Sequence, residues 1–197
     1  MPYLLITLAY LLGAVPFGLL FAKTAGVDIR RAGSGNIGAT NVSRLLGRKL
    51  GTLTLLADLG KGLLPMLAVR WLLQEAPLTE LWVVLAGAAA FLGHLFPIYL
   101  KFKGGKGVAT ALGVFLFLAP WAVLVCAVIF ATVVFFSGYV SLGSLATAAL
   151  LPLVLWLLGA ANLHIGLALF VALFIWLRHY ENIGRLLTGQ EKSWKNN

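Results

Sequence analysis

Charged residues, and acidic ones above all, are scarce in this sequence of 197 residues. Only 11% of the chain is Asp, Glu, Lys or Arg, and just 6 residues are acidic, whereas an ordinary soluble domain is about 25% charged. Apolar residues make up 61% of the chain, and the mean hydropathy is +0.98. This balance excludes a disordered chain, a water-soluble globular domain and a nucleic-acid-binding domain. We therefore expect an all-α integral membrane protein that partners membrane lipids and no nucleic acid.

Cysteine, histidine and clustered carboxylates are also few. The one cysteine, Cys126, lies in an apolar run, which excludes an intrachain disulfide framework and argues against a thioester intermediate. The 3 histidines do not follow zinc-ligand spacing. Asp28 and Glu191 look isolated, and Asp58 and Glu181 come from different segments, so no magnesium site is expected. The sequence predicts neither a metal nor a cofactor.

Apolar runs divide the chain into membrane spans, since a transmembrane helix needs roughly 20 apolar residues. No Lys or Arg precedes Lys23 and no A-x-A-like cleavage site follows the first run, so this run is expected to be a retained span. The run 108–136 has no charge and is too long for one span, and Pro120 near its middle would break a helix. The predicted spans are residues 3–22, about 51–73, 80–100, 108–136 (one span or two), 140–158 and 163–179.

The placement of positive charge decides between one span and two over 108–136. With two helices there, seven spans result, and 13 of the 15 basic residues fall in loops or tails on one face, leaving only Lys61 and Arg70. The positive-inside rule then predicts an outside N-terminus and a cytoplasmic C-terminus in a single domain, residues 1–197. Two helices of about 13 residues would each cross only some 20 Å. At least one is therefore expected to be short, which would sink the loop 101–107 into the membrane face.

The first unusual loop, residues 31–44, is rich in glycine and in neutral hydrogen-bond donors. Three glycines expose backbone N–H groups, which can form an anion-binding nest, and an arginine side chain matches phosphate in a bidentate manner. A flexible connecting loop is the alternative, although such linkers rarely combine Gly with Asn, Thr and Arg directly before a helix. The candidate phosphate ligands are Ser34, Asn36, Thr40, Asn41 and Arg44.

The second unusual loop lies within residues 93–110. It resembles a Walker A motif only superficially, because the spacing fails and Gly107 stands where that motif has Lys or Ser/Thr; nucleotide binding by this route is rejected. A glycine turn with two lysines before a helix N-terminus remains a candidate phosphate site. Lys101 can be explained by topology alone. The candidates are Lys103, Lys106 and the amides of Gly104, Gly105 and Gly107.

The third segment, residues 178–191, follows the last span. If the helix continues, Arg178, Glu181, Asn182 and Arg185 share one face, and an intrahelical salt bridge accounts for Glu181 with Arg185. That pair does not explain His179, three residues before Asn182. Histidine is the side chain best suited to move a proton near neutral pH.

Smaller polar features lie nearby in the predicted topology. Asp58 and Lys61 are three positions apart within the second span, where an ionisable pair is a functional hypothesis by default and mutual neutralisation is the alternative. Ser141 offers a hydroxyl on the same membrane face. Asp58, Lys61 and His94 are given a structural or secondary role, and His164, on the outer side, is given none.

The three motifs SGNIGATN (34–41), GHLFPIYLKFKGGKGVAT (93–110) and RHYENIGRLLTGQE (178–191) resemble those of the acyl-phosphate:glycerol-3-phosphate acyltransferase family, PlsY. The D-x-x-K-G at 58–62 and VSLGS at 140–144 are also similar, so the resemblance covers nearly the whole chain. It implies that the acyl group of a long-chain acyl phosphate passes to the sn-1 hydroxyl of glycerol 3-phosphate. The products are 1-acylglycerol 3-phosphate and inorganic phosphate, in the first acylation of phospholipid synthesis at the cytoplasmic face of the bacterial inner membrane.

The site residues are expected to meet at the inner leaflet. Residues 34–44 would bind phosphate and orient the glycerol. The residues expected to be catalytic are Ser34, Lys106, His179 and Asn182, and Ser141 and Glu181 are expected to bind substrate. Lys103, Lys106 and the glycine amides would neutralise the acyl phosphate. His179, held by Asn182 or Glu181, or else a substrate phosphate, would take the hydroxyl proton. The H-x-x-x-x-D motif of thioester-dependent acyltransferases is missing, because Tyr99, Leu169 and Gly184 follow the histidines at that spacing. A transporter for an organic phosphate is the alternative, but polar residues gather at one interface and no broken-helix repeats are evident.

Overall fold

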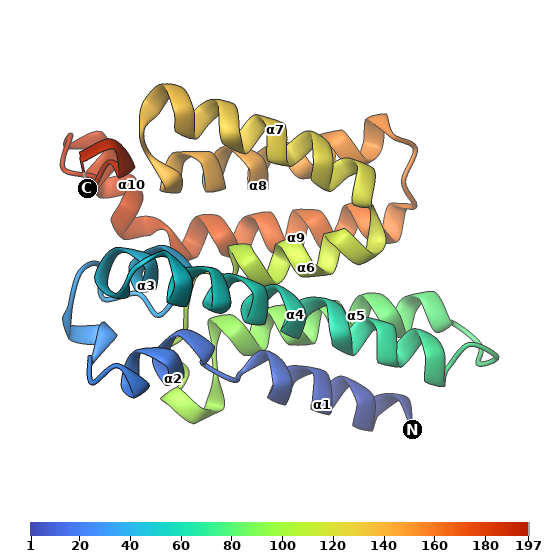
Figure 1. Cartoon of the computed structure of the whole chain (residues 1–197). Helices are drawn as coiled ribbons and strands as arrows, with labels where there is room; N and C mark the ends of the chain where they lie inside the picture. Colours follow the sequence, from blue (N-terminus) through green and yellow to red (C-terminus); the bar gives the residue numbers. More distant parts are fainter. Residues whose placement is uncertain (197) are drawn as a thin grey trace. The chain divides into compact units, whose positions relative to one another are not determined.

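The computed structural model describes residues 1–196, and within that part of the chain every regular element is a helix (Figure 1). The chain divides into two compact units, Met1–Phe117 and the part from Leu118 onward. Unit 1 holds α1 (Pro2–Gly13), α2 (Phe17–Thr24), η1 (Ile29–Arg31), α3 (Ala39–Leu46), α4 (Arg48–Leu72), α5 (Thr79–Leu95), η2 (Ile98–Leu100) and α6 (Val108–Leu118). The last residue of α6, Leu118, is the first residue of unit 2. Unit 2 holds α7 (Pro120–Ser137), α8 (Val140–Leu157), α9 (Asn162–Arg178), α10 (Tyr180–Leu187) and η3 (Trp194–Asn196).

The helices confirm a multi-pass membrane architecture. Five segments are long and apolar enough to cross a membrane, namely Pro2–Thr24, α4, Thr79–Leu100, α7 and α8. A sixth is added if α9 and α10, which meet at a bend of 60°, count as one span. The remaining apolar helix, α6, has 11 residues and is about 16 Å long, too short to cross a bilayer alone. Seven spans and the orientation of the termini stay predictions.

The break predicted within 108–136 is confirmed, but its proportions are not. Ala119 leaves the helical conformation and Pro120 begins α7, since proline fits the first position of a helix but not its interior. Instead of two helices of similar length, α6 has 11 residues and α7 has 18. The prediction of one short helix is therefore correct for α6, while α7 has the length of a full span.

The first predicted span, 3–22, is also interrupted. The chain leaves the helix between Gly13 and Phe17 because Pro16 cannot supply a backbone donor, and α1 and α2 form on either side. Irregular backbone at membrane depth needs partners from the protein. Lys61 of α4 supplies one, since its Nζ donates a 2.9 Å hydrogen bond to the carbonyl of Val15.

Small residues allow the helices of unit 1 to approach one another closely. A Cβ added to Gly13 of α1 would lie 2.1 Å from the Ala90 carbonyl oxygen of α5, and one added to Gly93 of α5 would lie 2.3 Å from the Tyr10 carbonyl oxygen. A Cβ on Gly62 of α4 would lie 2.3 Å from the Thr110 carbonyl oxygen of α6. Such small-residue contacts are how helices associate in lipid, where water does not drive them together.

Unit 2 is built on α8, which packs against both α7 and α9. The chain after α10 returns to the end of α7, where the backbone N–H of Trp194 donates to the Gly138 carbonyl at 2.9 Å and its indole donates to the Val134 carbonyl at 3.2 Å. Trp194 thus contacts backbone carbonyls at the C-terminal end of α7, and one of them, that of Val134, also accepts from the backbone N–H of Gly138 at 2.8 Å. The C-terminal segment is thus attached to the α7–α8 corner.

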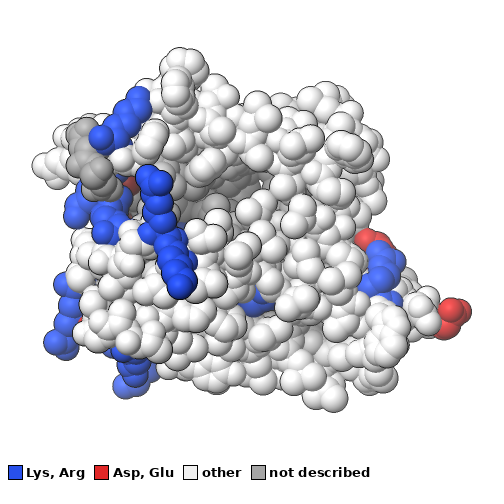
Figure 2. Space-filling view, viewed as in Figure 1, with Lys and Arg blue, Asp and Glu red and all other residues white. Residues whose placement is uncertain are grey.

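The exposed charged side chains of unit 1 gather at its two ends. Figure 2 shows Lys and Arg side chains at the end of the unit where α2 and α3 lie in Figure 1, and a small group of both signs at the opposite end. That second group belongs to the α4–α5 turn, where Arg70 pairs with Glu80. The basic loops therefore lie at one end of the spans, as the positive-inside argument requires.

Candidate active site

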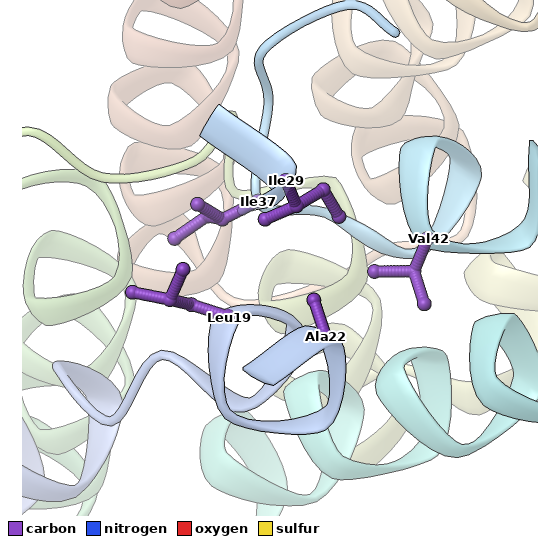
Figure 3. Packing of buried hydrophobic residues seen from close by; sticks show 5 residues of the cluster. All are labelled: Leu19, Ala22, Ile29, Ile37 and Val42. Carbon is purple, nitrogen blue, oxygen red and sulfur yellow. The ribbon is translucent and has the colours of Figure 1, made fainter. Parts of the chain in front are cut away.

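The glycine loop, residues 31–38, is packed rather than flexible. Ile29 of η1 and Ile37 of the loop are buried against Leu19 and Ala22 of α2 and Val42 of α3 (Figure 3). Leu100, just before the second motif, packs against the same cluster. The flexible-linker alternative is therefore wrong, and the structure brings the first two motifs to one apolar cluster within unit 1.

Asn41 fixes the conformation of the glycine loop from inside. Its side chain is 2% exposed, and its Oδ1 accepts a 2.9 Å hydrogen bond from the backbone N–H of Ser34. Its Nδ2 donates to three carbonyls, at 2.9 Å to Asn36, 3.1 Å to Ala32 and 3.4 Å to Ile29. The amide of Asn41 is thus committed to the loop itself, which gives this residue a supporting place beneath the candidate phosphate ligands.

The other candidates of the first motif surround that support. Ser34 and Thr40 are exposed, and Asn36 is partly buried and accepts from the backbone N–H of Gly38 at 3.3 Å. Arg44 is partly buried, and its Nε lacks a hydrogen-bond partner in the described part of the chain. A buried guanidinium nitrogen without an acceptor is costly unless an anion supplies one. The geometry of the loop therefore suits a phosphate ligand at Arg44.

The lysine loop, residues 101–107, folds back over the end of α5. The backbone N–H groups of Gly104 and Gly105 donate to the carbonyls of Leu95 and His94, at 3.2 and 3.1 Å. A Cβ at Gly105 would lie 2.2 Å from His94 Nε2. The prediction that these two amides face an anion is corrected here: they cap α5, and glycine is required because the loop backbone lies directly on His94.

The backbone of the lysine loop is strained next to its lysines. Lys101 and Phe102 both have positive φ, 52° and 64°, a region that side chains other than glycine rarely adopt. Gly107 has φ +85°, and a Cβ there would lie 2.4 Å from the Phe91 ring. Lys103 is exposed and Lys106 is partly buried, so two cations stand immediately before the N-terminus of α6.

A buried ion pair lies below these loops in unit 1. Lys61 Nζ is 2.8 Å from Asp58 Oδ1, and both side chains are at most 3% exposed. His94 Nδ1 lies 3.8 Å from the same Asp58 oxygen. The predicted pairing of Asp58 with Lys61 is confirmed, and His94 joins it.

In unit 2 the third motif is bent at its histidine, so the predicted helical face is interrupted: Arg178 ends α9, whereas Glu181, Asn182 and Arg185 lie together on α10. His179 ends α9 and begins α10, across the 60° bend. Its ring is 3% exposed, and Nδ1 lies 2.8 Å from the Ile175 carbonyl oxygen. Because a carbonyl only accepts, this contact places the hydrogen on Nδ1, and in the neutral ring Nε2 is then the basic nitrogen. The carbonyl of Ile175 thus orients the imidazole, a role predicted for Asn182 or Glu181.

Glu191 is the residue that sequence reasoning missed. Its Oε1 accepts from Ser141 at 2.7 Å and from Asn182 at 2.6 Å, and its Oε2 accepts from Arg185 Nε at 2.7 Å. Burial raises the pKa of this carboxyl, but the hydrogen bonds from Arg185, Ser141 and Asn182 outweigh it and hold the pKa below its usual range. Glu191 therefore ties α8, α10 and the tail together.

Two further acidic residues complete the picture. Asp28, expected to be isolated like Glu191, pairs with Arg30 at 3.3 Å and Arg31 at 3.6 Å. The predicted salt bridge between Glu181 and Arg185 is confirmed, at 3.9 Å. Asp28 and Glu191 thus each neutralise arginine charge that lies close by in the sequence.

Comparisons with known proteins agree with these motifs. The family model described as glycerol-3-phosphate acyltransferase matches residues 3–189. The chain belongs to the glycerol-3-phosphate acyltransferase family. A glycerol-3-phosphate acyltransferase of Desulfotalea psychrophila is 58% identical over 195 residues, covering 99% of each chain. One of Geobacter metallireducens is 55% identical, covering 98% of this chain and 97% of that protein.

Solved structures of the family add bound molecules. The chain is similar to the crystal structure of PlsY, an integral membrane glycerol 3-phosphate acyltransferase, in its glycerol 3-phosphate form, with a TM-score of 0.92, 39% identity and coverage of 98% and 95%. The lysophosphatidic acid form of PlsY gives a TM-score of 0.89 at the same identity, with coverage of 98% and 94%. The family that the three motifs indicated is therefore confirmed, and a place in phospholipid biosynthesis follows from the family.

Proposed function

We propose that this glycerol-3-phosphate acyltransferase uses a long-chain acyl phosphate as its donor. The sn-1 hydroxyl oxygen of glycerol 3-phosphate attacks the acyl carbon, and an ester bond forms. The bond from the acyl carbon to the phosphate oxygen breaks, and inorganic phosphate leaves with its bridging oxygen. An acyl phosphate is a mixed anhydride with a good leaving group, so positioning and positive charge can supply most of the catalysis.

The loops of unit 1 support the binding of two phosphates. Arg44 of α3 offers a buried Nε without an acceptor in the described part of the chain. Ser34 and Asn36 belong to the loop that Asn41 holds in shape, and Thr40 lies in the first turn of α3. We assign these residues to glycerol 3-phosphate, the molecule named for one PlsY structure. Lys103 and Lys106 are assigned to the acyl phosphate and to the departing phosphate, while Gly104 and Gly105 hold the lysine loop against the end of α5.

The third motif is assigned two roles, accepting the hydroxyl proton and orienting the glycerol. With its hydrogen on Nδ1, His179 has Nε2 as the nitrogen able to accept the proton of the attacking hydroxyl. A substrate phosphate is the alternative acceptor. Asn182, Ser141 and Glu181 are assigned to substrate binding and orientation, and Glu191 keeps two of them in place.

The membrane setting follows from charge. We propose that the enzyme lies in the bacterial inner membrane with seven spans, an outside N-terminus, a cytoplasmic C-terminus and its site at the cytoplasmic face. The grouping of Lys and Arg at one end of unit 1 supports this placement (Figure 2). Glycerol 3-phosphate would then enter from the cytoplasm and the apolar donor from the bilayer.

A donor comparison with purified protein in detergent tests the proposal. Palmitoyl phosphate with glycerol 3-phosphate is expected to give 1-palmitoylglycerol 3-phosphate and phosphate, and palmitoyl-CoA is expected to give neither. Turnover with palmitoyl-CoA alone would show a different donor. Protein that moves glycerol 3-phosphate into vesicles but forms no ester with either donor would show a transporter.

A further inference from the structure

The buried pair Asp58–Lys61 is connected on one side to the break in the first span. Lys61 Nζ donates to Asp58 Oδ1 at 2.8 Å and to the Val15 carbonyl at 2.9 Å. The same ammonium lies 5.9 Å from the centre of the Phe17 ring. A lysine that only neutralised Asp58 would not need these contacts. Lys61 therefore also fixes the junction of α1 and α2.

On its other side the pair is connected to the lysine loop. Asp58 Oδ1 lies 3.8 Å from His94 Nδ1, at the last turn of α5. The carbonyl of His94 accepts the N–H of Gly105, and a Cβ on Gly105 would meet the His94 ring at 2.2 Å. The imidazole is thus held between the carboxylate below it and the backbone of the lysine loop above it.

We propose that Asp58, Lys61 and His94 form a buried positioning network that fixes the conformation of the lysine loop required for acyl transfer. The inference rests on the proposed phosphate-binding role of that loop. Its strained residues, Lys101 and Phe102 with positive φ, need support from the surrounding structure. The network supplies it by fixing the imidazole on which Gly105 lies, and so it sets where Lys106 stands. None of the three residues needs to touch a substrate.

A charge-free double variant separates positioning from neutralisation. Removing one partner leaves a buried charge unpaired, whereas removing both is often tolerated, so Asp58→Asn/Lys61→Met is the informative change. The matched control is Arg70→Gln/Glu80→Gln, which removes the ion pair at the far end of α4 and α5. Amide hydrogen exchange in lipid nanodiscs reports on the loop, and steady-state kinetics report on the reaction.

The network predicts that the amides of 102–105 exchange about tenfold faster in the double variant, while those of the α4 and α5 interiors do not change. The KM for palmitoyl phosphate is expected to rise about tenfold. The control variant is expected to match the wild type in both measurements. If neither the loop exchange nor the KM changes, the proposal is overturned. It is also overturned if the only change is a fall in kcat that matches the loss of folded protein.

Variants of His94 decide the question if the double variant fails to fold. His94→Asn keeps a polar nitrogen near the position of Nδ1, which lies 3.8 Å from Asp58 Oδ1, whereas His94→Leu does not. The network predicts slower loop exchange and a lower KM in His94→Asn than in His94→Leu, and equal values would contradict it. Loop exchange is measured without substrates, so its result does not depend on which acyl donor the enzyme uses. If the wild-type protein is inactive with palmitoyl phosphate, the proposed function is refuted. The exchange rates of the variants then still decide whether the network positions the loop.

Discussion

Asn182 Nδ2 donates a 2.6 Å hydrogen bond to Glu191 Oε1, across the end of α10. The same carboxylate accepts from Ser141 at the start of α8 and from Arg185 on α10. Since Asn182 lies three residues after His179, the carboxylate of Glu191 stabilises the segment that carries the candidate base.

Replacing Glu191 should therefore destabilise this part of unit 2. Glu191→Ala removes the acceptor of three hydrogen bonds, and we expect a loss of about 2–4 kcal/mol in the free energy of unfolding. Glu181→Gln is the matched control, because Glu181 is exposed and its contact with Arg185 is 3.9 Å; its cost should stay below about 1 kcal/mol. Thermal unfolding in detergent measures both, and equal costs would contradict the role of Glu191.

The pH dependence of stability checks the same carboxylate. Because its pKa is lower in the folded protein than in the unfolded chain, Glu191 contributes fully above the ordinary glutamate pKa of about 4.3. The contribution is lost as the pH falls through the lower, folded pKa. As the pH falls below about 4.3, the difference in stability between wild type and Glu191→Gln should narrow. A difference that widens would show the opposite shift.

His179 is expected to contribute to the chemical step. His179→Ala should lower kcat by about 10²- to 10⁴-fold if the imidazole accepts the hydroxyl proton, with a smaller change in KM. Steady-state kinetics from pH 5 to 9 measure this, with His179→Gln as a second variant. Near-normal turnover in both would assign the proton to a substrate phosphate.

Lys106 and Lys101, two lysines of the same loop, should differ in effect. Lys106→Ala is expected to lower kcat/KM by about 100-fold or more, because it removes a cation at the candidate phosphate site. Lys101→Ala should change it less than about twofold, since this exposed side chain serves topology. The phosphate-release assay compares them, and equal effects would remove Lys106 from the site.

Asn41 should act through the fold of the glycine loop. Asn41→Ala removes four hydrogen bonds and leaves three loop carbonyls without this donor, so we expect a loss of about 2–4 kcal/mol in the free energy of unfolding. Asn36→Ala, which loses one hydrogen bond to Gly38, should cost about 1 kcal/mol. Thermal unfolding ranks the two variants. A larger loss for Asn36→Ala would contradict the supporting role of Asn41.

Local patterns carried most of the fold. Apolar run length and Pro120 located the spans and the break between α6 and α7, because each depends on a few neighbouring residues. The interruption at Pro16 was missed, since hydropathy over 3–22 is continuous and the Lys61 contact that completes the break comes from 46 residues away. The unequal lengths of α6 and α7 follow from the place of Pro120 in the run.

Within the candidate site, residue types were easier to predict than their partners. The Glu181–Arg185 and Asp58–Lys61 pairs follow from helical spacing alone. Glu191 looked isolated because its partner Ser141 is 50 residues away and the tail returns to α8. The amides of Gly104 and Gly105 looked available to an anion, because a glycine-rich sequence does not show that its loop folds back on the end of α5.

Oxygen labelling during a single turnover tests the central claim most directly. Glycerol 3-phosphate carrying ¹⁸O in its sn-1 hydroxyl is mixed with palmitoyl phosphate and excess enzyme. Mass spectrometry then gives the amount and the ¹⁸O content of both products. Direct transfer from the acyl phosphate predicts that the label is retained in the ester of 1-palmitoylglycerol 3-phosphate and that one unlabelled phosphate forms for each ester. Phosphate released without ester, or ester formed without phosphate, would contradict the account.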